Sequence, residues 1–263
     1  MIYLKKLLII FLILLTLTSC FHSTVPTDSS EISYEKLSAK KEGWGFRRTA
    51  EGPEFTKEQT DKMNKYKCIY RENTKDKSIY LTFDEGYEKG YTPIILDVLR
   101  DKDVKAAFFV TGQYVRENPD LIKRMEKEGH IVGNHTLNHP SLPEIRDSQK
   151  LEKELSELDR LIYAVTGKAT HFLRPPKGEY SEYTLAETKA LGYTNVFWSQ
   201  AYVDWNDDET KETAFEKITS DLHPGCVLLL HAVSKGNADA LGDVIDYARK
   251  EGYTFKNLNE YKN

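Results

Sequence analysis

The chain has 263 residues, of which 40% are hydrophobic and 11% aromatic. That composition can bury a large core and excludes a wholly disordered chain. Its 37 Lys and Arg residues against 41 Asp and Glu residues give a net charge of −4, which excludes the basic surface of a nucleic-acid-binding protein. Three cysteines are too few for a disulfide scaffold.

The first twenty residues resemble a bacterial lipoprotein signal. Lys5 and Lys6 precede an apolar run over residues 7–17, which is short for a membrane span. The run ends in Leu17-Thr18-Ser19-Cys20, which is similar to a lipobox. The alternative is a plain secretory signal that contains a cysteine.

The lipobox resemblance divides the start of the chain into two parts. Residues 1–19 would be a signal peptide that is removed, and Cys20 would then carry lipid. Residues 20–33, rich in Ser and Thr, would form a tether. We therefore expect an extracytoplasmic protein that its lipid anchors to the bacterial cell membrane.

Residues 34–77 form a short N-terminal extension ahead of the main domain, residues 78–263. Within the extension, residues 55–67 are expected to form one helix, and Trp44 and Phe46 to anchor the segment onto the main domain. The extension is either a wall of a substrate groove or a packing collar, and the sequence favours the collar.

From residue 78 onward, strand and helix patterns alternate. The predicted strands cover residues 78–83, 104–110, 130–133, 170–173, 194–198, 225–230 and 254–255, and the predicted helices residues 93–100, 120–128, 147–166, 181–191, 209–222 and 237–251. This alternation predicts an α/β fold with parallel strands and right-handed crossovers. Because no glycine-rich phosphate loop follows the first strand, we favour a distorted (β/α) barrel of about seven strands over a doubly wound sheet.

Reactive residues follow five of these strands. In a barrel of this kind, the loops after the carboxyl ends of the strands carry the chemistry. The five groups lie at residues 82–86, 135–139, 174–178, 204–205 and 229–231. Five such groups in one barrel are hard to explain as core filling, so they predict an active site.

His135 and His139 are spaced like ligands of a divalent metal. On one helical turn, side chains four residues apart lie on the same side, and Pro140 would end that turn at His139. The alternative is a pair of surface histidines at the start of a helix. The acidic pair Asp84-Glu85 favours the metal site, in which the cation would bind water and a substrate oxygen.

Two carboxylates and an arginine complete the expected catalytic group. Of Asp84 and Glu85, one would be the general base and the other a metal ligand or an orienting group. Arg174 would hold the base ionised, and its alternative role is a surface salt bridge. His231 would protonate a leaving nitrogen, with its pKa raised by Asp204.

The loop after Arg174 is expected to contact the substrate. Its prolines and glycine fix the backbone, so that an N–H group such as that of Lys177 would face a developing oxyanion. The alternative, purely structural interpretation of Asp204-Trp205 is a capped turn with a core aromatic residue. We assign substrate binding to Pro176, Lys177, Gly178, Trp205 and Leu229.

Together the five groups resemble the five motifs of the polysaccharide deacetylases, carbohydrate esterase family 4, from about residue 78 to the C-terminus. Residues 82–92, 44–46 and 202–205 resemble the branch of delta-lactam-biosynthetic de-N-acetylases. Those enzymes remove acetyl from N-acetylmuramic acid in peptidoglycan, which allows muramic delta-lactam to form in the spore cortex. The family barrel is distorted and has fewer than eight strands.

The resemblance implies a role for each residue. The base would be Asp84, the ligands of a metal that is usually zinc would be His135 and His139, the residue that orients the base would be Arg174, and the acid would be His231, tuned by Asp204.

At Glu85 the chain departs from the family, most of which has an Asp there as a metal ligand. The longer side chain either still reaches the metal or swings away. From the sequence, we expect Glu85→Ala to weaken zinc binding without removing it.

The resemblance, with the residues that carry it, implies metal-dependent hydrolysis of the N-acetyl group of N-acetylmuramic acid in peptidoglycan. The alternatives are a deacetylase of N-acetylglucosamine in peptidoglycan or chitooligosaccharides, and a catalytically inactive glycan-binding lipoprotein. The expected partners are the glycan strand and, through the lipid, the membrane; we expect a monomer. Cys226 lies in an apolar run, which favours a buried thiol over a disulfide with Cys68.

Overall fold

The computed structural model describes residues 37–49, 52–206 and 208–262. The predicted signal peptide, the tether and Cys20 lie outside these described residues. Within them, no helix has the length and apolar character needed to cross a membrane.

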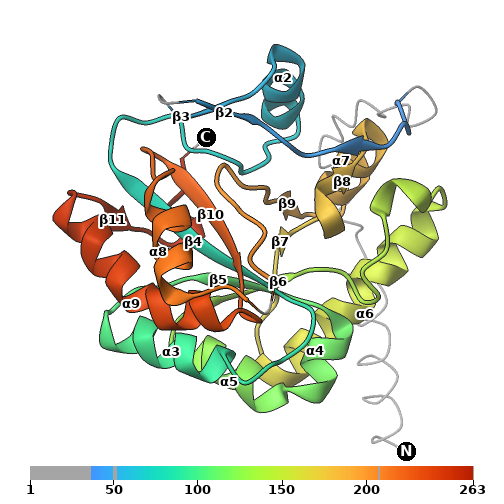
Figure 1. The fold of residues 1–263 in the computed structure, drawn as a ribbon. Coiled ribbons are helices and arrows are strands. Elements are labelled where there is room, and N and C mark those ends of the chain that lie inside the picture. The colour runs from blue at the N-terminus through green and yellow to red at the C-terminus, as the bar shows by residue number, and fades with distance from the viewer. Residues whose placement is uncertain (1–36, 50–51, 207, 263) are drawn as a thin grey trace, which may run out of the picture. The chain divides into compact units, whose positions relative to one another are not determined.

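A seven-stranded sheet forms the centre of the fold (Figure 1). Its order is β10-β4-β5-β6-β7-β9, and β11 also pairs with β4. The strands are β4 (Ser78–Glu85), β5 (Ala107–Val110), β6 (Ile131–Asn134), β7 (Phe172–Leu173), β9 (Thr194–Asn195), β10 (Cys226–His231) and β11 (Thr254–Phe255). All pairings in this sheet are parallel, which confirms the predicted α/β fold.

The sheet curls into an incomplete barrel. Past β9, Gln200 forms an isolated parallel bridge to Leu228 of β10, and the Leu229 amide donates to the Gln200 carbonyl at 2.9 Å. The chain therefore closes the ring through a single bridge instead of a full strand. This is the distorted barrel that the sequence predicts.

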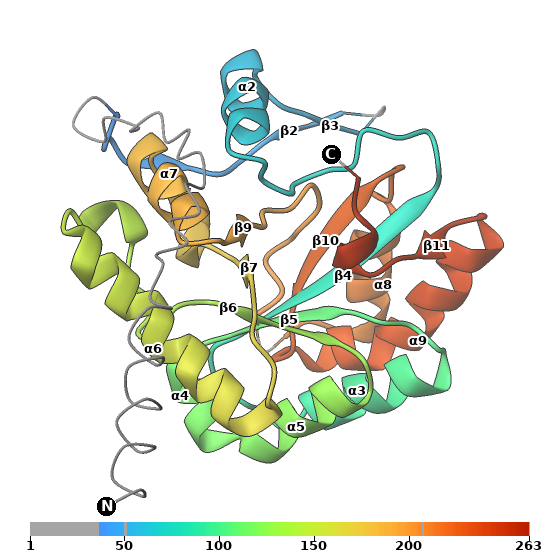
Figure 2. The ribbon, with the colours of Figure 1, turned by 180° about the vertical axis from the view of Figure 1, so that it is seen from behind.

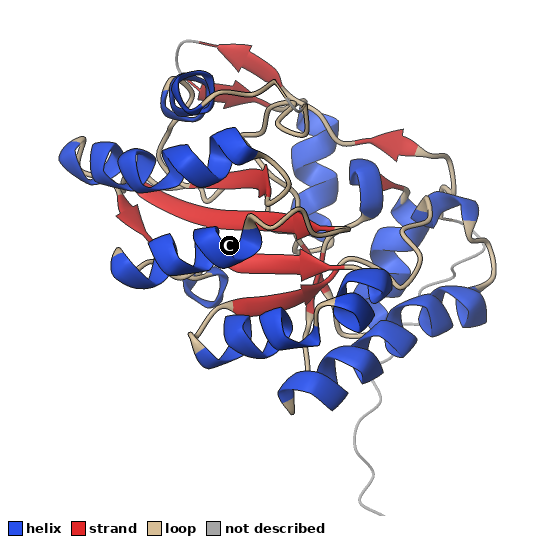
Figure 3. Ribbon diagram, turned by 60° about the horizontal axis from the view of Figure 1, so that its bottom comes forward, coloured by secondary structure: helices blue, strands red, loops and turns tan. Residues whose placement is uncertain are grey.

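Helices pack on both sides of the strands (Figure 3). They are α3 (Thr92–Asp101), α4 (Gly112–Glu117), α5 (Pro119–Lys127), α6 (Ser148–Thr166), α7 (Glu182–Ala190), α8 (Lys211–Thr219) and α9 (Lys235–Lys250), with short 3-10 turns η2 (Leu142–Glu144), η3 (Pro176–Gly178) and η4 (Leu258–Glu260). Six of the helices match the predictions. The sequence pattern missed α4, since six residues are too few to show a helical period.

Alternate residues of β4 face two different parts of the core. Ile79, Leu81 and Phe83 pack with apolar residues of α3, α4 and α9 on the helix-covered side. Tyr80 packs in a separate cluster with residues of β10 and the loop after β9. Because successive side chains of a strand point to opposite faces, Asp84 continues the side of Tyr80, which places it inside the curl of the barrel.

The N-terminal extension lies across one end of the barrel, where Figures 1 and 2 show α2 with β2 and β3. It contains β1 (Glu42–Gly43), β2 (Arg47–Thr49), β3 (Gly52–Glu54) and α2 (Lys57–Lys65), a shorter helix than the predicted one. The hairpin strands β2 and β3 pair with each other, whereas β1 pairs antiparallel with β8 (Glu179–Tyr180) of the main domain.

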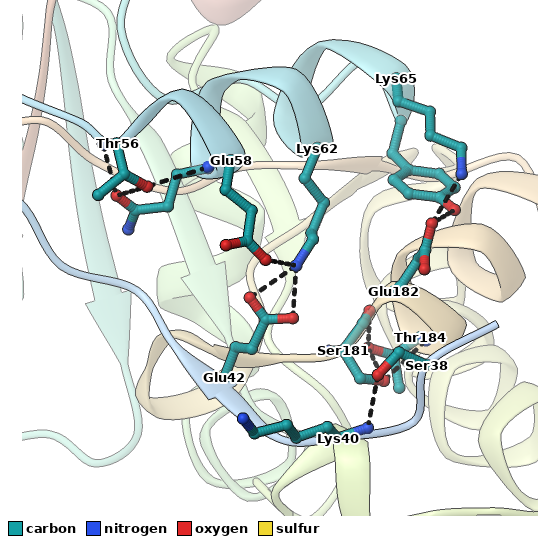
Figure 4. Close-up of polar contacts among 12 residues, drawn as sticks. Ser38, Lys40, Glu42, Thr56, Glu58, Lys62, Lys65, Ser181, Glu182 and Thr184 are labelled. Atoms are coloured by element: carbon teal, nitrogen blue, oxygen red, sulfur yellow. Dashed lines mark hydrogen bonds and ion pairs between the residues drawn. The ribbon is translucent and has the colours of Figure 1, made fainter.

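Ion pairs and one tryptophan attach the extension to the barrel. Lys65 of α2 pairs with Glu182 of α7 at 2.7 Å, whereas Lys62 pairs at 2.5 Å with Glu42 of β1, within the extension (Figure 4). Trp44 is buried, its ring stacks on Phe55, and its indole N–H donates to the Trp198 carbonyl at 2.7 Å. The extension is therefore packed against the loops that follow β7 and β9.

Cys68 and Cys226 are both buried and carry free thiols. Burial raises the pKa of each thiol to about 12, so both remain protonated at neutral pH. Cys226 thus has the buried-thiol character that its apolar run favours.

Candidate active site

The carboxyl ends of the parallel strands bring the predicted catalytic residues together. Asp84 is the second-last residue of β4, and the register of β10 on β4 sets His231 directly opposite it. His135 and Arg174 are the first residues after β6 and β7. Four segments that are distant in sequence therefore meet at one edge of the sheet.

Arg174 and Asp84 form a buried ion pair. The Arg174 Nη1 atom lies 2.8 Å from Asp84 Oδ1, and the arginine has no exposed surface. Its remaining N–H groups donate to the carbonyls of Val196 at 3.1 Å and Phe197 at 3.4 Å, and its guanidinium lies over the Phe109 ring. Burial alone would raise the pKa of Asp84, but the charge of Arg174 outweighs it, so the carboxylate is ionised at neutral pH.

His135 and His139 lie on a loop, which corrects the predicted helical turn. Thr136 and His139 both have positive φ, of 69° and 56°, so the segment turns back on itself without forming a helix. The Asn134 side chain accepts from the Thr136 amide at 2.7 Å, and the Thr136 hydroxyl accepts from the His139 amide at 3.0 Å. Although no helix forms, the loop brings the two imidazole centroids to 4.9 Å.

His231 and Asp204 form a second pair of ionisable side chains in the site, joined by a hydrogen bond. His231 Nδ1 lies 2.8 Å from Asp204 Oδ1, and the His231 amide donates to Oδ2 at 2.7 Å. The Asn237 side chain also donates to Oδ2, at 2.6 Å, and itself accepts from the Tyr202 hydroxyl. Burial would lower the pKa of His231, but its hydrogen bond to Asp204 and that residue's charge outweigh burial and raise it.

Two connected hollows open beside these pairs, and both are lined by Asp84, His135, His139, Trp205 and His231. The first lobe, of about 640 Å³, is also lined by Arg48, Lys177, Trp198, Ala201, Tyr202, Val203 and Leu229. The second lobe, of about 880 Å³, is also lined by Gly86, Tyr87, Thr111, Gln113, Arg116, Leu137, Asn138 and Val233. A substrate that extends to both sides of the catalytic residues fits this arrangement better than a small isolated molecule does.

The predicted substrate residues divide into lining and supporting positions. Lys177, Trp205 and Leu229 line the first lobe, whereas Pro176 and Gly178 are buried within the loop itself. The structure thus places three of them where a substrate would touch and two where they shape the loop.

This arrangement can activate a water molecule and protonate a leaving group. Asp84 is an ionised base inside the cavity, and His231 is an imidazole held ready for protonation on a neighbouring strand. An ionised base and a protonated acid that face one cavity are the requirement for hydrolysis of an amide or ester.

Comparison with known proteins decides between such reactions. The family model for polysaccharide deacetylase matches residues 71–196. The peptidoglycan-N-acetylmuramic acid deacetylase PdaA of Bacillus subtilis is 47% identical over 222 residues, which is 82% of this chain and 84% of that protein. This chain belongs to the polysaccharide deacetylase family. It is accordingly a hydrolase whose reaction is the removal of N-acetyl groups.

Solved structures and more distant relatives agree with that assignment. The structure of Bacillus subtilis PdaA, a family 4 carbohydrate esterase, matches this deacetylase with a TM-score of 0.83 at 45% identity, and covers 86% of this chain and 98% of that chain. A peptidoglycan-N-acetylglucosamine deacetylase of Bacillus cereus is 31% identical over 200 residues, which is 74% of this chain and 72% of that protein.

The histidines of the deacetylase suit a divalent cation. His135 Nδ1 lies 2.8 Å from the Arg174 carbonyl, which leaves Nε2 free as a ligand, 3.5 Å from Asp84 Oδ2. Burial lowers the pKa of His135 to about 4 and also lowers that of His139, so both rings are neutral, as metal ligands must be. Neutral imidazoles are nitrogen ligands that zinc and similar cations accept, so the donor chemistry of this pair suits a metal.

Glu85, the third predicted ligand, lies apart from these imidazoles. β4 remains extended through Glu85, so its side chain takes the opposite face from Asp84 and does not line either lobe. Both its carboxylate oxygens are buried without a hydrogen-bond partner, and burial raises the pKa of Glu85 well above its ordinary value. Among the described residues, no three His, Cys, Asp or Glu side chains are grouped closely enough to hold a metal.

Sequence reasoning missed several residues of the site, of which four matter most for its chemistry. Asn237 is the start of a helix in the sequence pattern, and nothing there shows that it holds Asp204. Arg48, Trp198 and Tyr202 line the first lobe. Of the four, only Tyr202 had a signal, since it belongs to the stretch at residues 202–205 that resembles the delta-lactam branch.

Proposed function

We propose that this deacetylase removes the N-acetyl group of N-acetylmuramic acid in peptidoglycan and releases acetate. The observation that carries the proposal is the pair of ionised Asp84 and raised-pKa His231 in one cavity, each held by its own buried partner. The 47% identity with PdaA supports muramic acid as the sugar.

The residues of this chain would move two protons. Asp84, kept ionised by Arg174, would accept a proton from the water that attacks the acetyl carbon. As the C–N bond breaks, protonated His231 would donate its proton to the nitrogen, so the products are acetate and the free amine of the sugar. The backbone N–H of Lys177 would donate to the oxygen that becomes negative.

A divalent cation, which we expect to be zinc, would be held by His135 and His139. When bound, it would supply Lewis acidity toward the acetamide oxygen and the water. The support for this part of the proposal is the neutral charge of the two rings and their common position in the lining of both lobes.

Mass spectrometry of the glycan tests the reaction. The zinc-loaded protein is incubated with muramic-acid glycan stripped of its peptide, and fragments are analysed before and after. We expect acetyl loss from muramic residues only, and none with Asp84→Asn. If neither muramic nor glucosamine residues lose acetyl, the protein is not a deacetylase of these glycans.

The same fragments separate the second candidate. The 31% identity with a peptidoglycan-N-acetylglucosamine deacetylase supports glucosamine as an alternative sugar, and acetyl loss from glucosamine residues would establish it. An inactive glycan-binding protein is less well supported, because the Asp84–Arg174 and His231–Asp204 pairs are intact. Glycan affinity of the wild type without any turnover would favour that third interpretation.

We further propose that Cys20 carries lipid, that the enzyme acts as a monomer outside the cytoplasmic membrane, and that its product becomes muramic delta-lactam in the spore cortex. The support is the lipobox resemblance and the resemblance to the delta-lactam branch. Loss of the protein from the membrane fraction on Cys20→Ala tests the anchor, and cortex fragments of a deletion strain, analysed for lactam, test the role.

A further inference from the structure

The first lobe is unusually basic for a protein with a net charge of −4. Arg48 and Lys177 line it, and among the described residues Asp84, which is already paired with Arg174, is the only acidic one in the lining. The described lining therefore carries positive charge that none of its own carboxylates neutralises. Such a cavity favours an anionic group on the substrate.

Lys177 is held in a conformation that costs energy. Its φ of 59° and ψ of 8° are left-handed, a region that residues with a Cβ adopt only at an energetic cost. The side chain is exposed, and no hydrogen bond or ion pair engages its ammonium within the described part of the chain. A strained lysine whose ammonium is left without a partner at the wall of an active site points to a role in binding.

The backbone on both sides of Lys177 is fixed by buried contacts. A Cβ on Gly178 would lie 2.7 Å from Trp198 Cη2 and 3.0 Å from Trp44 Cβ, so only glycine fits there. The Trp44 amide donates to the Gly178 carbonyl at 2.8 Å, and β1 pairs with β8 directly afterwards. The extension therefore holds the loop that places Lys177 in the lining of the first lobe.

The extension also supplies the second cation. Arg48, on β2, lies 3.2 Å through Nε from Asp221 Oδ2, and its Nη2 donates to the Ala201 carbonyl. These contacts fix the guanidinium at the wall of the lobe and leave further N–H groups for a ligand. The charge of Arg48 is partly balanced by Asp221, so Lys177 is the stronger candidate for an anion.

Muramic acid differs from glucosamine by an anionic group next to the reacting one. It carries a lactyl ether, which ends in a carboxylate, on the ring carbon adjacent to the carbon that bears the acetamide. When the acetamide lies at Asp84, the lactyl group must therefore lie in the same cavity. Glucosamine has only a hydroxyl there and gains nothing from a cation.

We propose that Lys177, assisted by Arg48, binds the lactyl carboxylate and so sets the preference for muramic acid over glucosamine. This inference rests on the proposed function and names the residues that would decide its sugar. Trp198, Tyr202 and Val203 line the same lobe and would contact the sugar's apolar surface without distinguishing the two sugars.

The test changes the charge on the substrate and on the protein in turn. Three tetrasaccharides are compared as substrates of the zinc-loaded enzyme. They are an alternating glucosamine–muramic glycan with free lactyl carboxylates, the same glycan with each carboxylate converted to the neutral amide, and chitotetraose. For the wild type, we expect the amide to lower kcat/KM at muramic residues roughly tenfold, chiefly through KM, as for loss of one charged hydrogen bond.

Variants then assign the effect. Lys177→Gln should lower kcat/KM for the free acid roughly tenfold and should remove most of the difference between acid and amide. Arg48→Gln should show the same pattern with a smaller effect, and Lys177→Arg should restore most of the preference. Lys123→Gln, at a surface position of α5 that lines neither lobe, is the matched control.

Three results would overturn the inference. Equal kcat/KM of the wild type on acid and amide would show that the carboxylate is not bound, whatever the variants do. A Lys177→Gln enzyme that loses activity equally on acid and amide would show a merely structural role. If the wild type releases no acetate from any muramic glycan, the proposed function itself fails.

Discussion

The buried carboxylate of Asp204 should control the alkaline limit of activity through His231. Asp204→Asn keeps the shape of the side chain and removes its charge. In the wild type, that carboxylate accepts from His231 Nδ1 at 2.8 Å and from the His231 amide at 2.7 Å, and it has no exposed surface. Because Asn237 also donates to it at 2.6 Å, the amide of the variant is held in the same place.

The size of the change in activity follows from the opposing influences on the pKa of His231. Burial favours the neutral imidazole, and Asp204 opposes it most strongly, with a smaller contribution from the charge of Asp84, so the variant retains the burial and loses most of the compensation. An opposite charge at this distance shifts a pKa by about 1 to 3 units. The pKa of His231 should therefore fall below the ordinary value of 6.5, and kcat at pH 7.5 should fall roughly tenfold to 1000-fold.

The assay is the pH profile of kcat and kcat/KM for acetate release from muramic glycan. In the wild type, the alkaline limb should lie above pH 6.5, because the raised pKa keeps His231 protonated there. In Asp204→Asn, that limb should move to lower pH while the acidic limb, set by Asp84, stays. His231→Gln should lack the alkaline limb.

The stability of the fold provides an independent check. A histidine whose pKa is raised by folding stabilises the native state fully below its unfolded pKa, and this contribution is lost as the pH rises through the folded value. As the pH rises above 6.5, the urea concentration at the midpoint of unfolding should therefore decrease more for the wild type than for His231→Gln. An alkaline limb that does not move in Asp204→Asn would refute the assignment of His231 as the acid.

Three further predictions follow from buried groups. Arg174→Met leaves the Asp84 carboxylate buried and unpaired, so it should lower the free energy of unfolding, measured by urea denaturation, by about 3 to 5 kcal/mol. It should also move the acidic limb of the pH–rate profile to higher pH. An unchanged denaturation midpoint would contradict the prediction. The sequence predicted that substitution of Glu85 weakens zinc binding, but Glu85 faces away from both lobes. Glu85→Gln should therefore leave the zinc affinity within about twofold of the wild type by calorimetric titration. His135→Gln should lower that affinity by at least about tenfold. Gly178→Ala should destabilise the fold by about 1 to 3 kcal/mol in thermal unfolding, since its Cβ would meet a ring carbon at 2.7 Å, and a variant as stable as the wild type would show that the loop can move aside.

Local sequence patterns predicted most of the elements because those patterns are local in origin. The apolar repeats of α6 and the capping residues of α7 act within one or two turns, and both helices form where they were expected. The failures lie where the pattern is short or the chain turns. α4 has too few residues to show a period, and the loop at 135–139 has helical spacing but two positive φ angles.

The site was predictable to the extent that it depends on strand ends. Asp84, Arg174 and His231 meet because parallel strands present their carboxyl ends at one edge, which the alternation of strand and helix already implies. The direction of Glu85 was not predictable in the same way. A strand that bends after Asp84 would bring both carboxylates to the cavity, and a strand that stays extended, as β4 does, separates them.

The sequence by itself determined that this protein is an α/β barrel with acid, base and imidazole groups at the ends of its strands, because periodicity and motif spacing are properties of neighbouring residues. Only the tertiary structure decided that Arg48 of the extension and Lys177 of the loop after β7 face the same cavity, and that Asn237 holds Asp204. The physical reason is that such contacts join residues far apart along the chain. They depend on how whole elements pack, which no local pattern records.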